Sequence, residues 1–383
     1  MKKALFFAIS ACLLKLSGYG QDNHYAISLN YTQGLKAFST FNTPFSGNYN
    51  GGEVAYHLFV DSVGWARKLS VSDIELQASY LNLQHITFGN QPAASNLMGN
   101  HYSLAAGLNV RLAKWGSVSW MFSPGLGLLY APKNFYTTNN QNFVIGSALN
   151  VFAYARTKLI VPVSSRLSLE GGAGISHASN GGLSFPNDGF DNISAFAGIM
   201  VDFDKEAQPT RKHRFEVADD QFTIMATIGG RSEEKTGYTK NTKTNTGYYA
   251  DTAIQHQTPL IKQANMVLGY THRFSPLFSF TAGTDLAYYL NTFSWNNFFR
   301  TYEGSYTTYG HFSLGVTAGA DLWLGRLVFS ADAGCFVWDH FFYPDTRFYA
   351  PVGIKYFITP HIAVQARAVI NEYSSIGIFI GFH

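Results

Sequence analysis

The sequence predicts an all-β fold, a transmembrane antiparallel β-barrel. Aromatic residues make up 16% of the chain and charged residues only 13%, whereas average proteins carry about 25% charged residues. Beyond the N-terminal residues, no apolar run approaches the roughly 20 residues that a membrane helix needs. Segments of alternating apolar and polar residues recur instead, as in barrel strands with an apolar outer face. A secreted β-sandwich is the alternative, but long strands with aromatic residues at their ends favour the barrel.

The first twenty residues are typical of a secretory signal peptide. Lys2 and Lys3 precede an apolar run that ends at Leu14, and small residues follow up to Gly20. This pattern predicts a signal peptide over residues 1–20, cleaved before Gln21. Processing as a lipoprotein at Cys12 is the less favoured alternative, because the preceding apolar run is very short. The only other cysteine is Cys335, so the mature chain cannot form an internal disulfide.

Alternating segments fill the mature chain in two halves. We count roughly 16 of them, an even number as bacterial barrels require. The organisation predicted is a first barrel half over residues 21–203 that carries the active site, a polar periplasmic connection over 204–220, and a second half of unknown role over 221–383. One barrel of roughly 16 strands is the favoured arrangement. An eight-stranded barrel followed by a second eight-stranded half is the alternative.

The connections and the inward positions refine this prediction. Short connections near residues 115, 276, 325 and 359 alternate with long ones that follow residues near 34, 83, 130, 233 and 290. Short turns face the periplasm and long loops face outside, so the connection between residues 181 and 190 is expected to be external. The charged residues expected on the polar inner face favour one wide lumen; they are Glu170, Asp202, Asp285, Asp332 and Arg367.

The most informative stretch, residues 174–191, places reactive groups on two apolar strand faces. Odd-numbered residues from 167 to 175 are apolar or small, and the same parity continues to His177 and Ser179. After the loop, odd-numbered residues from 193 to 203 form another apolar face, which begins at Asp191. Because strand side chains alternate between faces, all three polar groups are expected at the rim of an apolar outer surface.

These residue types are the components of a nucleophilic hydrolase. A serine hydroxyl becomes nucleophilic when a histidine removes its proton, and a carboxylate orients the histidine. His177 and Ser179 are two positions apart on one face, and Asp191 lies within cross-strand range on the next strand. Asn180 and the backbone amides of Gly181 and Gly182 are placed to bind an oxyanion. An ester hydrolase that acts on lipid is therefore indicated.

The residue sequence of the motif is similar to that of a known family. His177 to Gly182 reads His-Ala-Ser-Asn-Gly-Gly, and Pro-Asn-Asp-Gly follows at 186–189. This resembles the signature of the PagL family of lipid A deacylases, also called acyloxyacyl hydrolases, which are outer-membrane barrels. The segment 142–150 also resembles the longer members. The resemblance implies that His177 is the base, Ser179 the nucleophile and Asp191 the third member, although the family usually has glutamate there. It covers residues 24–203 and implies nothing about 213–383.

The resulting hypothesis is an outer-membrane serine esterase that cleaves an ester-linked acyl chain of lipid A, with its site on the lipid-facing surface toward the outer leaflet. Its partners are lipopolysaccharide and outer-membrane lipids. With a net charge of +3 and no basic patch interleaved with aromatics, nucleic acid is not expected. No cofactor or metal is expected, since His311, His340 and His361 lack a second ligand at metal spacing. A passive porin with a decayed site and an outer-membrane phospholipase are the alternatives.

Overall fold

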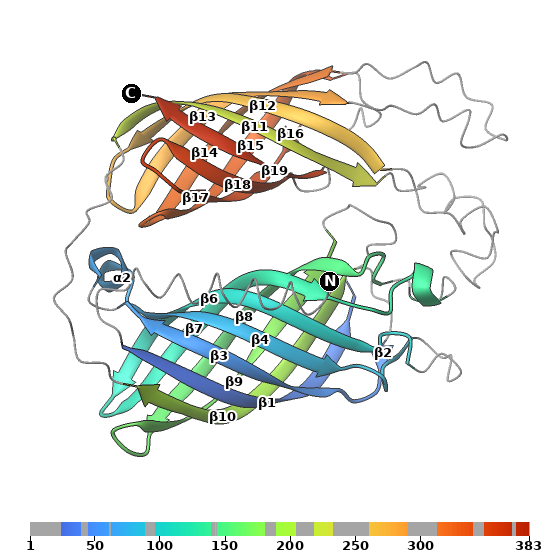
Figure 1. Cartoon of the computed structure of the whole chain (residues 1–383), viewed down its shortest axis with the longest axis vertical. Helices are drawn as coiled ribbons and strands as arrows, with labels where there is room; N and C mark the ends of the chain where they lie inside the picture. Colours follow the sequence, from blue (N-terminus) through green and yellow to red (C-terminus); the bar gives the residue numbers. More distant parts are fainter. Residues whose placement is uncertain are drawn as a thin grey trace. The chain divides into compact units, whose positions relative to one another are not determined.

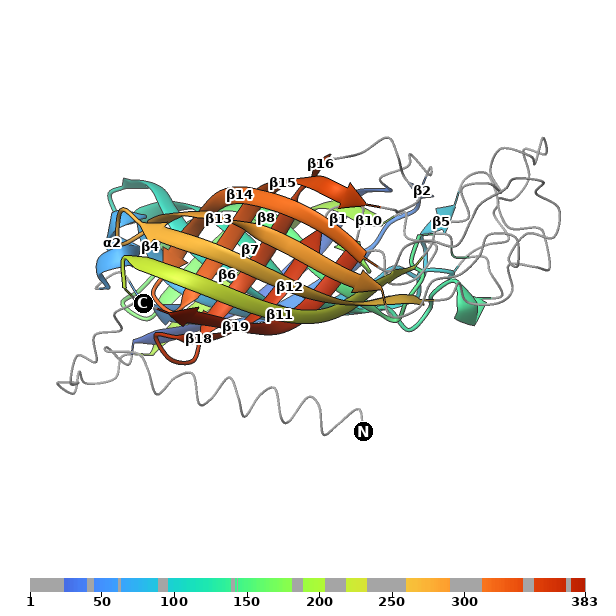
Figure 2. The same cartoon turned by 90° about the horizontal axis from the view of Figure 1, so that it is seen from above.

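The computed structural model describes most of the mature chain. The residues described are 24–39, 45–60, 63–88, 96–138, 142, 144–180, 189–203, 218–232, 260–289, 312–339, 348–369 and 373–382. The expected signal peptide and most of the connection 204–220 lie outside them. Within the described parts, no helix is long and apolar enough to cross a membrane. The chain divides into two compact units, which are drawn in Figures 1 and 2.

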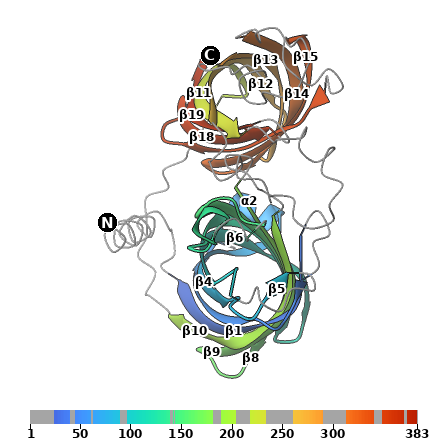
Figure 3. The ribbon, with the colours of Figure 1, turned by 90° about the vertical axis from the view of Figure 1, so that its right-hand side faces the viewer.

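The first unit is a closed eight-stranded antiparallel barrel. Its strands follow the chain around the ring, and β1 closes the ring by pairing with both β3 and β10. Figure 3 shows this ring nearly end-on. The strands are β1 (Tyr25–Phe38), β3 (Asn50–Phe59), β4 (Val71–Asn82), β6 (Asn100–Trp115), β7 (Val118–Tyr130), β8 (Leu149–Pro162), β9 (Leu167–Ser179) and β10 (Phe190–Phe203). The short elements between them are β2 (Phe45–Ser46), α2 (Gly64–Lys68), β5 (Thr87–Phe88) and the 3-10 helix η3 (Tyr136–Thr138).

The second unit closes in the same way. Eight strands form the ring through the pairings of β11 with β19 and of β14 with β15, and a two-residue strand flanks β15. The strands are β11 (Asp220–Ser232), β12 (Leu260–Arg273), β13 (Phe278–Tyr289), β14 (Phe312–Leu324), β15 (Leu327–Asp339), β16 (Phe348–Tyr349), β17 (Pro351–Phe357), β18 (Ile362–Val369) and β19 (Tyr373–Phe382).

The favoured prediction of one barrel with about 16 strands is therefore wrong, and the alternative of two eight-stranded barrels is confirmed. In the single barrel, β10 would hydrogen-bond to β11. Instead β10 is saturated by β9 and β1, and β11 by β12 and β19. The wide lumen is wrong for the same reason. Glu170 and Asp202 belong to the first barrel, whereas Asp285, Asp332 and Arg367 belong to the second.

The interior of the first barrel is filled by bonded charged and polar side chains. Lys158 pairs with Glu75 at 2.7 Å and lies 3.6 Å from Glu170, and Arg156 pairs with Glu53 at 2.9 Å. Inward glycines make room for the larger side chains: a Cβ on Gly125 would lie 2.2 Å from the Tyr154 ring. Glycine in a strand often marks such a close approach. The inside of this barrel is a packed core, as small barrels require.

Apolar clusters lie at both ends of the first barrel, one against its outer face and one above its interior. At the end where β3 meets β4, α2 contributes Ala66 to a cluster with Val60 and Val71. At the opposite end, residues from the long connections gather above the barrel. This second cluster, called the cap below, includes Leu83, Ile86, Leu97, Met98, Ala131, Val144 and Ile145 together with Ala178 of β9 and Phe190 of β10. The cap therefore fixes the ends of the two strands that carry the predicted site.

Candidate active site

His177 and Asp191 lie directly opposite each other on neighbouring antiparallel strands. The register of β9 and β10 pairs Asp191 with His177, and β8 places Ala153 on the other side of the histidine. The Nδ1 atom of His177 lies 2.7 Å from Oδ1 of Asp191. This contact fixes the tautomer, because Nδ1–H donates to the carboxylate and Nε2 is left as the basic nitrogen. The cross-strand meeting predicted from the sequence is thus present.

The pair lies on the outer face of the barrel. The His177 side chain is 43% exposed and that of Asp191 is 17% exposed. On the same face of β9, Leu169 and Ile175 are also exposed. The intervening residue Ala178 is buried in the cap. The outward parity inferred from the sequence is therefore confirmed, and the surrounding exposed surface is apolar.

Ser179 ends β9 and shares the outward parity of His177. It is half-buried and pairs in register with Val151 of β8. Along a strand, residues two apart on one face are roughly 7 Å apart. No hydrogen bond between the Ser179 hydroxyl and His177 forms in the described structure. Catalytic hydrogen bonds are often long before substrate binds, so the nucleophile role of Ser179 stays a prediction.

Of the predicted oxyanion donors, only one can be placed. Asn180 follows β9 directly and is buried. Gly181 and Gly182 lie outside the described residues, so their roles stay predictions. Asn180 is adjacent in the chain to Ser179, so the predicted oxyanion donor and the predicted nucleophile belong to one local segment.

Two asparagines support the site without having been predicted from the sequence. On the inner side of the same strand pair, the Nδ2 group of Asn192 donates to Ser176 Oγ at 2.5 Å. This contact lies one residue from the His177–Asp191 pair on each strand and holds their register. Asn142 is the second support. Its side chain donates to the carbonyls of Leu97 and Lys133 and accepts from two backbone amides, which organises the cap.

The interior of the same barrel holds a second serine–histidine–aspartate chain. Ser28 Oγ lies 3.0 Å from His57 Nε2, and His57 Nδ1 lies 2.8 Å from Asp73 Oδ1. All three residues are at most 3% exposed. They come from three strands with no shared motif, so no local pattern in the sequence marks them. No substrate can reach a serine that is completely covered. These three residues therefore have a structural role, and we call them the interior triad.

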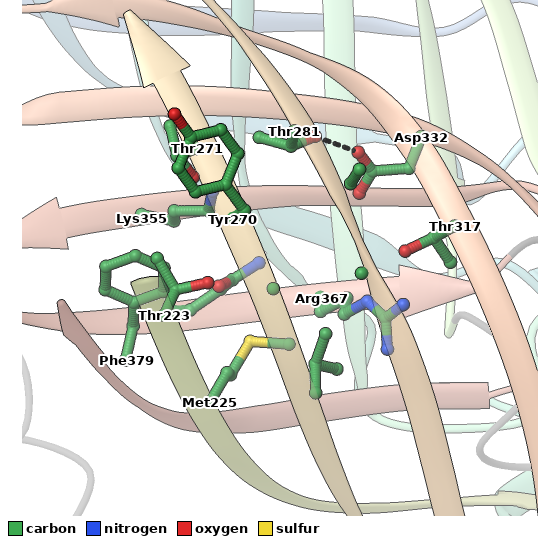
Figure 4. Close-up of a pocket in the computed structure, with 15 residues that line it drawn as sticks. Thr223, Met225, Tyr270, Thr271, Thr281, Thr317, Asp332, Lys355, Arg367 and Phe379 are labelled. Atoms are coloured by element: carbon green, nitrogen blue, oxygen red, sulfur yellow. Dashed lines mark hydrogen bonds between the residues drawn. The ribbon is translucent and has the colours of Figure 1, made fainter. Parts of the chain in front are cut away.

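The second barrel contains a small polar cavity, shown in Figure 4. Its volume is about 50 Å³, whereas ligand sites usually span about 300–1,000 Å³. Thr281 donates to Asp332 at its wall, at 2.7 Å. The two basic residues in the lining already bind carboxylates: Lys355 contacts Asp321 at 3.0 Å, and Arg367 contacts Asp285 at 2.7 Å. The cavity has room for a few waters and offers no activated nucleophile.

The remaining histidines are placed only in part. His361 lies exposed in the turn before β18, and His311 and His340 lie outside the described residues. Where side chains are described, no group of three or more His, Cys, Asp or Glu residues could hold a metal ion.

Comparison with known families agrees with the geometry of the first barrel. Residues 50–200 match the family described as lipid A 3-O-deacylase (PagL). Residues 222–373 match the family described as the C-terminal domain of acyloxyacyl hydrolase. The two matched ranges together span most of the chain. The chain belongs to the PagL family, in a long form with a second barrel. The expected resemblance is thus confirmed, and it extends into the second half, where none was predicted.

The similarity of the whole chain to known proteins is weak. No curated protein matches the sequence. Among solved structures, the outer membrane enzyme PagL is similar at 16% identity over 46% of this chain and 96% of that one, with a TM-score of 0.21. The NanC porin matches at 7% identity over 93% and 99%, with a TM-score of 0.16. The siderophore receptor PirA from Pseudomonas aeruginosa matches at 10% identity over 95% and 81%, with a TM-score of 0.21. Scores this low do not indicate a shared arrangement, so the family rests on the sequence matches.

Proposed function

We propose that this protein is an outer-membrane serine esterase that removes an ester-linked acyl chain from lipid A. The observation that carries the proposal is the His177–Asp191 hydrogen bond on an exposed, apolar outer face. Membership of the lipid A 3-O-deacylase family supports the same substrate. The bond that is cut is a carboxylic ester, and water is the acceptor of the acyl group.

In the first half-reaction, Ser179 Oγ attacks the carbonyl carbon of the acyl ester. His177 Nε2 takes the serine proton, and Asp191 stabilises the imidazolium that forms. Asn180 and the amides of Gly181 and Gly182 stabilise the oxyanion. When the ester bond breaks, His177 returns the proton to the sugar oxygen, and the fatty acyl group remains on Ser179.

In the second half-reaction, His177 removes a proton from water, which attacks the acyl carbon. Collapse of the intermediate returns the proton to Ser179 and releases the fatty acid. No redox partner or metal enters these steps. The acid in the family is usually glutamate, and Asp191 is one methylene shorter. The register supports the shorter side chain here, because Asp191 lies directly opposite the histidine.

The outer position of the site suits a substrate that stays in the bilayer. Leu169 and Ile175 extend the apolar face of β9 away from His177 toward the other end of the strand. Acyl chains that lie along this face keep their burial in lipid, which is worth about 0.8 kcal/mol for each methylene. Only the ester must reach His177. The site then lies at the level of the outer leaflet, because the long connections of a barrel face outside.

A passive porin is the weaker alternative. A pore needs an open lumen, but the interior of the first barrel holds the paired Lys158 and Arg156, and the cap covers one of its ends. The described contacts of this barrel therefore favour a surface site over a channel.

The test is mass spectrometry of lipid A from cells with and without the gene. We expect a lipid A species that is lighter by one fatty acyl chain only when the gene is expressed. Phospholipids from the same cells are the internal control. Lysophospholipids with unchanged lipid A would identify a phospholipase instead, and no change in either lipid class would overturn the esterase proposal.

A further inference from the structure

The outer end of β1 carries a bulge next to the candidate site. Gly34 pairs with Ser194 and Lys36 pairs with Ile193, so Leu35 has no partner on β10. Before the bulge, the even-numbered residues of β1 are buried inside the barrel. Strict alternation would also turn Lys36 inward. The extra residue instead places Lys36 opposite an outward-facing residue, on the outer surface of the barrel.

Tyr49 holds this bulge from the inside. Its hydroxyl lies 2.7 Å from the carbonyl oxygen of Ile193 and 3.1 Å from that of Lys36. Its own carbonyl accepts the amide of Gly34 at 2.8 Å. The ring covers Gly34 so closely that a Cβ there would lie 2.1 Å from it. Bulges held in this way redirect side chains, and they occur often beside active sites.

The side chain that the bulge redirects is a cation that pairs with none of the described residues. Lys36 is exposed, and its ammonium group forms no hydrogen bond or ion pair with the described residues. The neighbouring Leu35 is 61% exposed on the same surface. A lysine on an apolar outer face must extend its charge to the membrane interface. A bound anion would offset the cost of its position.

Lys36 is also close to the catalytic pair. Two residues further along β1, Phe38 lies opposite Asp191, which lies opposite His177. With strands about 4.8 Å apart and about 3.4 Å between residues, the Cα atoms of Lys36 and His177 are roughly 12 Å apart. The flexible four-carbon stem of lysine can bring the ammonium group closer than the Cα atom to an ester bound at His177. The distance that remains between the ammonium group and the ester is on the scale of one sugar ring.

We propose that Lys36 is a substrate-binding residue that pairs with a phosphate group on the sugar of the same lipid whose ester is cleaved. The inference rests on the proposed function. Lipid A is a phosphorylated, acylated glucosamine lipid, so a cation one sugar away from the ester meets the chemistry of that substrate. Lys36 would then decide which phosphorylated lipids are held with an ester at His177, while taking no part in the bond-breaking steps.

The experiment uses the full-length protein in neutral detergent micelles at low salt. The substrates are an ester-acylated glucosamine phosphate lipid and the same lipid after its phosphate has been removed by a phosphatase. We would measure KM and kcat for the wild type, Lys36→Gln and Lys36→Arg. Lys114→Gln is the matched control, because Lys114 is an exposed lysine at the opposite end of the barrel. Heat-modifiable gel mobility verifies that each variant folds.

For Lys36→Gln we expect KM for the phosphorylated lipid to rise about tenfold, with kcat unchanged, because a charge-assisted contact is lost. KM for the phosphate-free lipid should not change, and high salt should reduce the difference. Lys36→Arg and Lys114→Gln should behave like the wild type. Equal effects on both lipids, or none, would overturn the inference. So would an effect that follows added anionic phospholipid rather than the substrate's own phosphate. Failure of the wild type to cleave either lipid would instead refute the proposed function.

Discussion

Two histidine–aspartate pairs of nearly the same geometry lie in the first barrel, one on its outer face and one in its interior. The Nδ1–Oδ1 distance is 2.7 Å for His177 and Asp191, and 2.8 Å for His57 and Asp73. In the interior triad, Ser28 is already hydrogen-bonded to the histidine, whereas no hydrogen bond joins Ser179 to His177 among the described residues. By hydrogen-bond geometry alone, the interior triad is the more complete.

The two histidine–aspartate pairs differ in whether a substrate can reach them. The outer histidine is 43% exposed, and the inner one is 1% exposed. The interior triad is part of the network that fills the barrel, because Asn109 donates to Glu75 at 3.1 Å and also contacts Asp73. The comparison shows that a serine–histidine–acid chain can serve to satisfy buried polar groups. Reactivity requires, in addition, a surface on which the substrate can lie.

The largest effect is expected from the outer histidine. His177→Ala should reduce deacylation to background, a loss on the order of 10⁶-fold, because His177 is the only basic group that the described residues place on the same strand face as Ser179. Release of fatty acid from lipid A by purified protein is the measurement. Heat-modifiable mobility shows whether the barrel still folds. Folded His177→Ala protein with activity near that of the wild type would mean that the reaction occurs elsewhere.

The next effect concerns the acid. Asp191→Asn should lower kcat by about 10³–10⁴-fold, because the amide no longer holds the reactive tautomer. Asp191→Glu should keep most of the activity, since the family usually has glutamate at this position. Single-turnover assays on the two variants, side by side, measure the difference. If Asp191→Asn is silent, the third member of the site is another residue.

The interior triad should respond in the opposite way. Ser28→Ala should leave kcat and KM within about twofold of the wild type, because Ser28 has no access to substrate. It should lower the free energy of unfolding by about 1–3 kcal/mol, because Nε2 of the buried His57 loses its partner. Urea unfolding in detergent, together with the deacylation assay, gives both quantities. A loss of activity without a loss of stability would contradict the structural role of the interior triad.

The smallest expected effect is a difference between two spin labels, one in contact with lipid and one in contact with water. A spin label at Ala173, on the outward face of β9, should be accessible to oxygen dissolved in lipid and protected from a water-soluble nickel chelate. A label at Ser164, in the exposed turn before β9, is the matched control and should show the reverse. The background is Cys335→Ser, which removes the half-buried native thiol. Contact of Ala173 with water rather than lipid would mean that the site does not open to the bilayer.

How far the sequence could predict these features depends on the range of the interactions involved. The outward placement of His177 and Asp191 follows from alternation over a few residues, and alternation is local. Closure of the first barrel depends on β1 pairing with β10, far away in the chain, so the sequence pattern did not separate two barrels of eight strands from one of 16. The inward charges such as Glu170 and Asp285 therefore seemed to line one lumen.

Other features had no local signal at all. Residues 29 and 16 positions apart form the interior triad, and nothing in the spacing of Ser28, His57 and Asp73 marks their meeting. The bulge at Leu35 breaks the alternation of β1, because Tyr49 binds it from another segment of the chain. A pattern with a period of two places Lys36 inside the barrel, and only the register with β10 places it outside.

Two serine variants in the same cells test whether deacylation occurs on the outer face of the first barrel. Ser179→Ala and Ser28→Ala each remove one hydroxyl from the first barrel, one from its outer face and one from the interior triad. Mass spectrometry of lipid A should show full deacylation with Ser28→Ala and none with Ser179→Ala, at equal amounts of folded protein. Deacylation that survives Ser179→Ala and disappears with Ser28→Ala would mean that the reaction depends on the buried serine and not on the outer face.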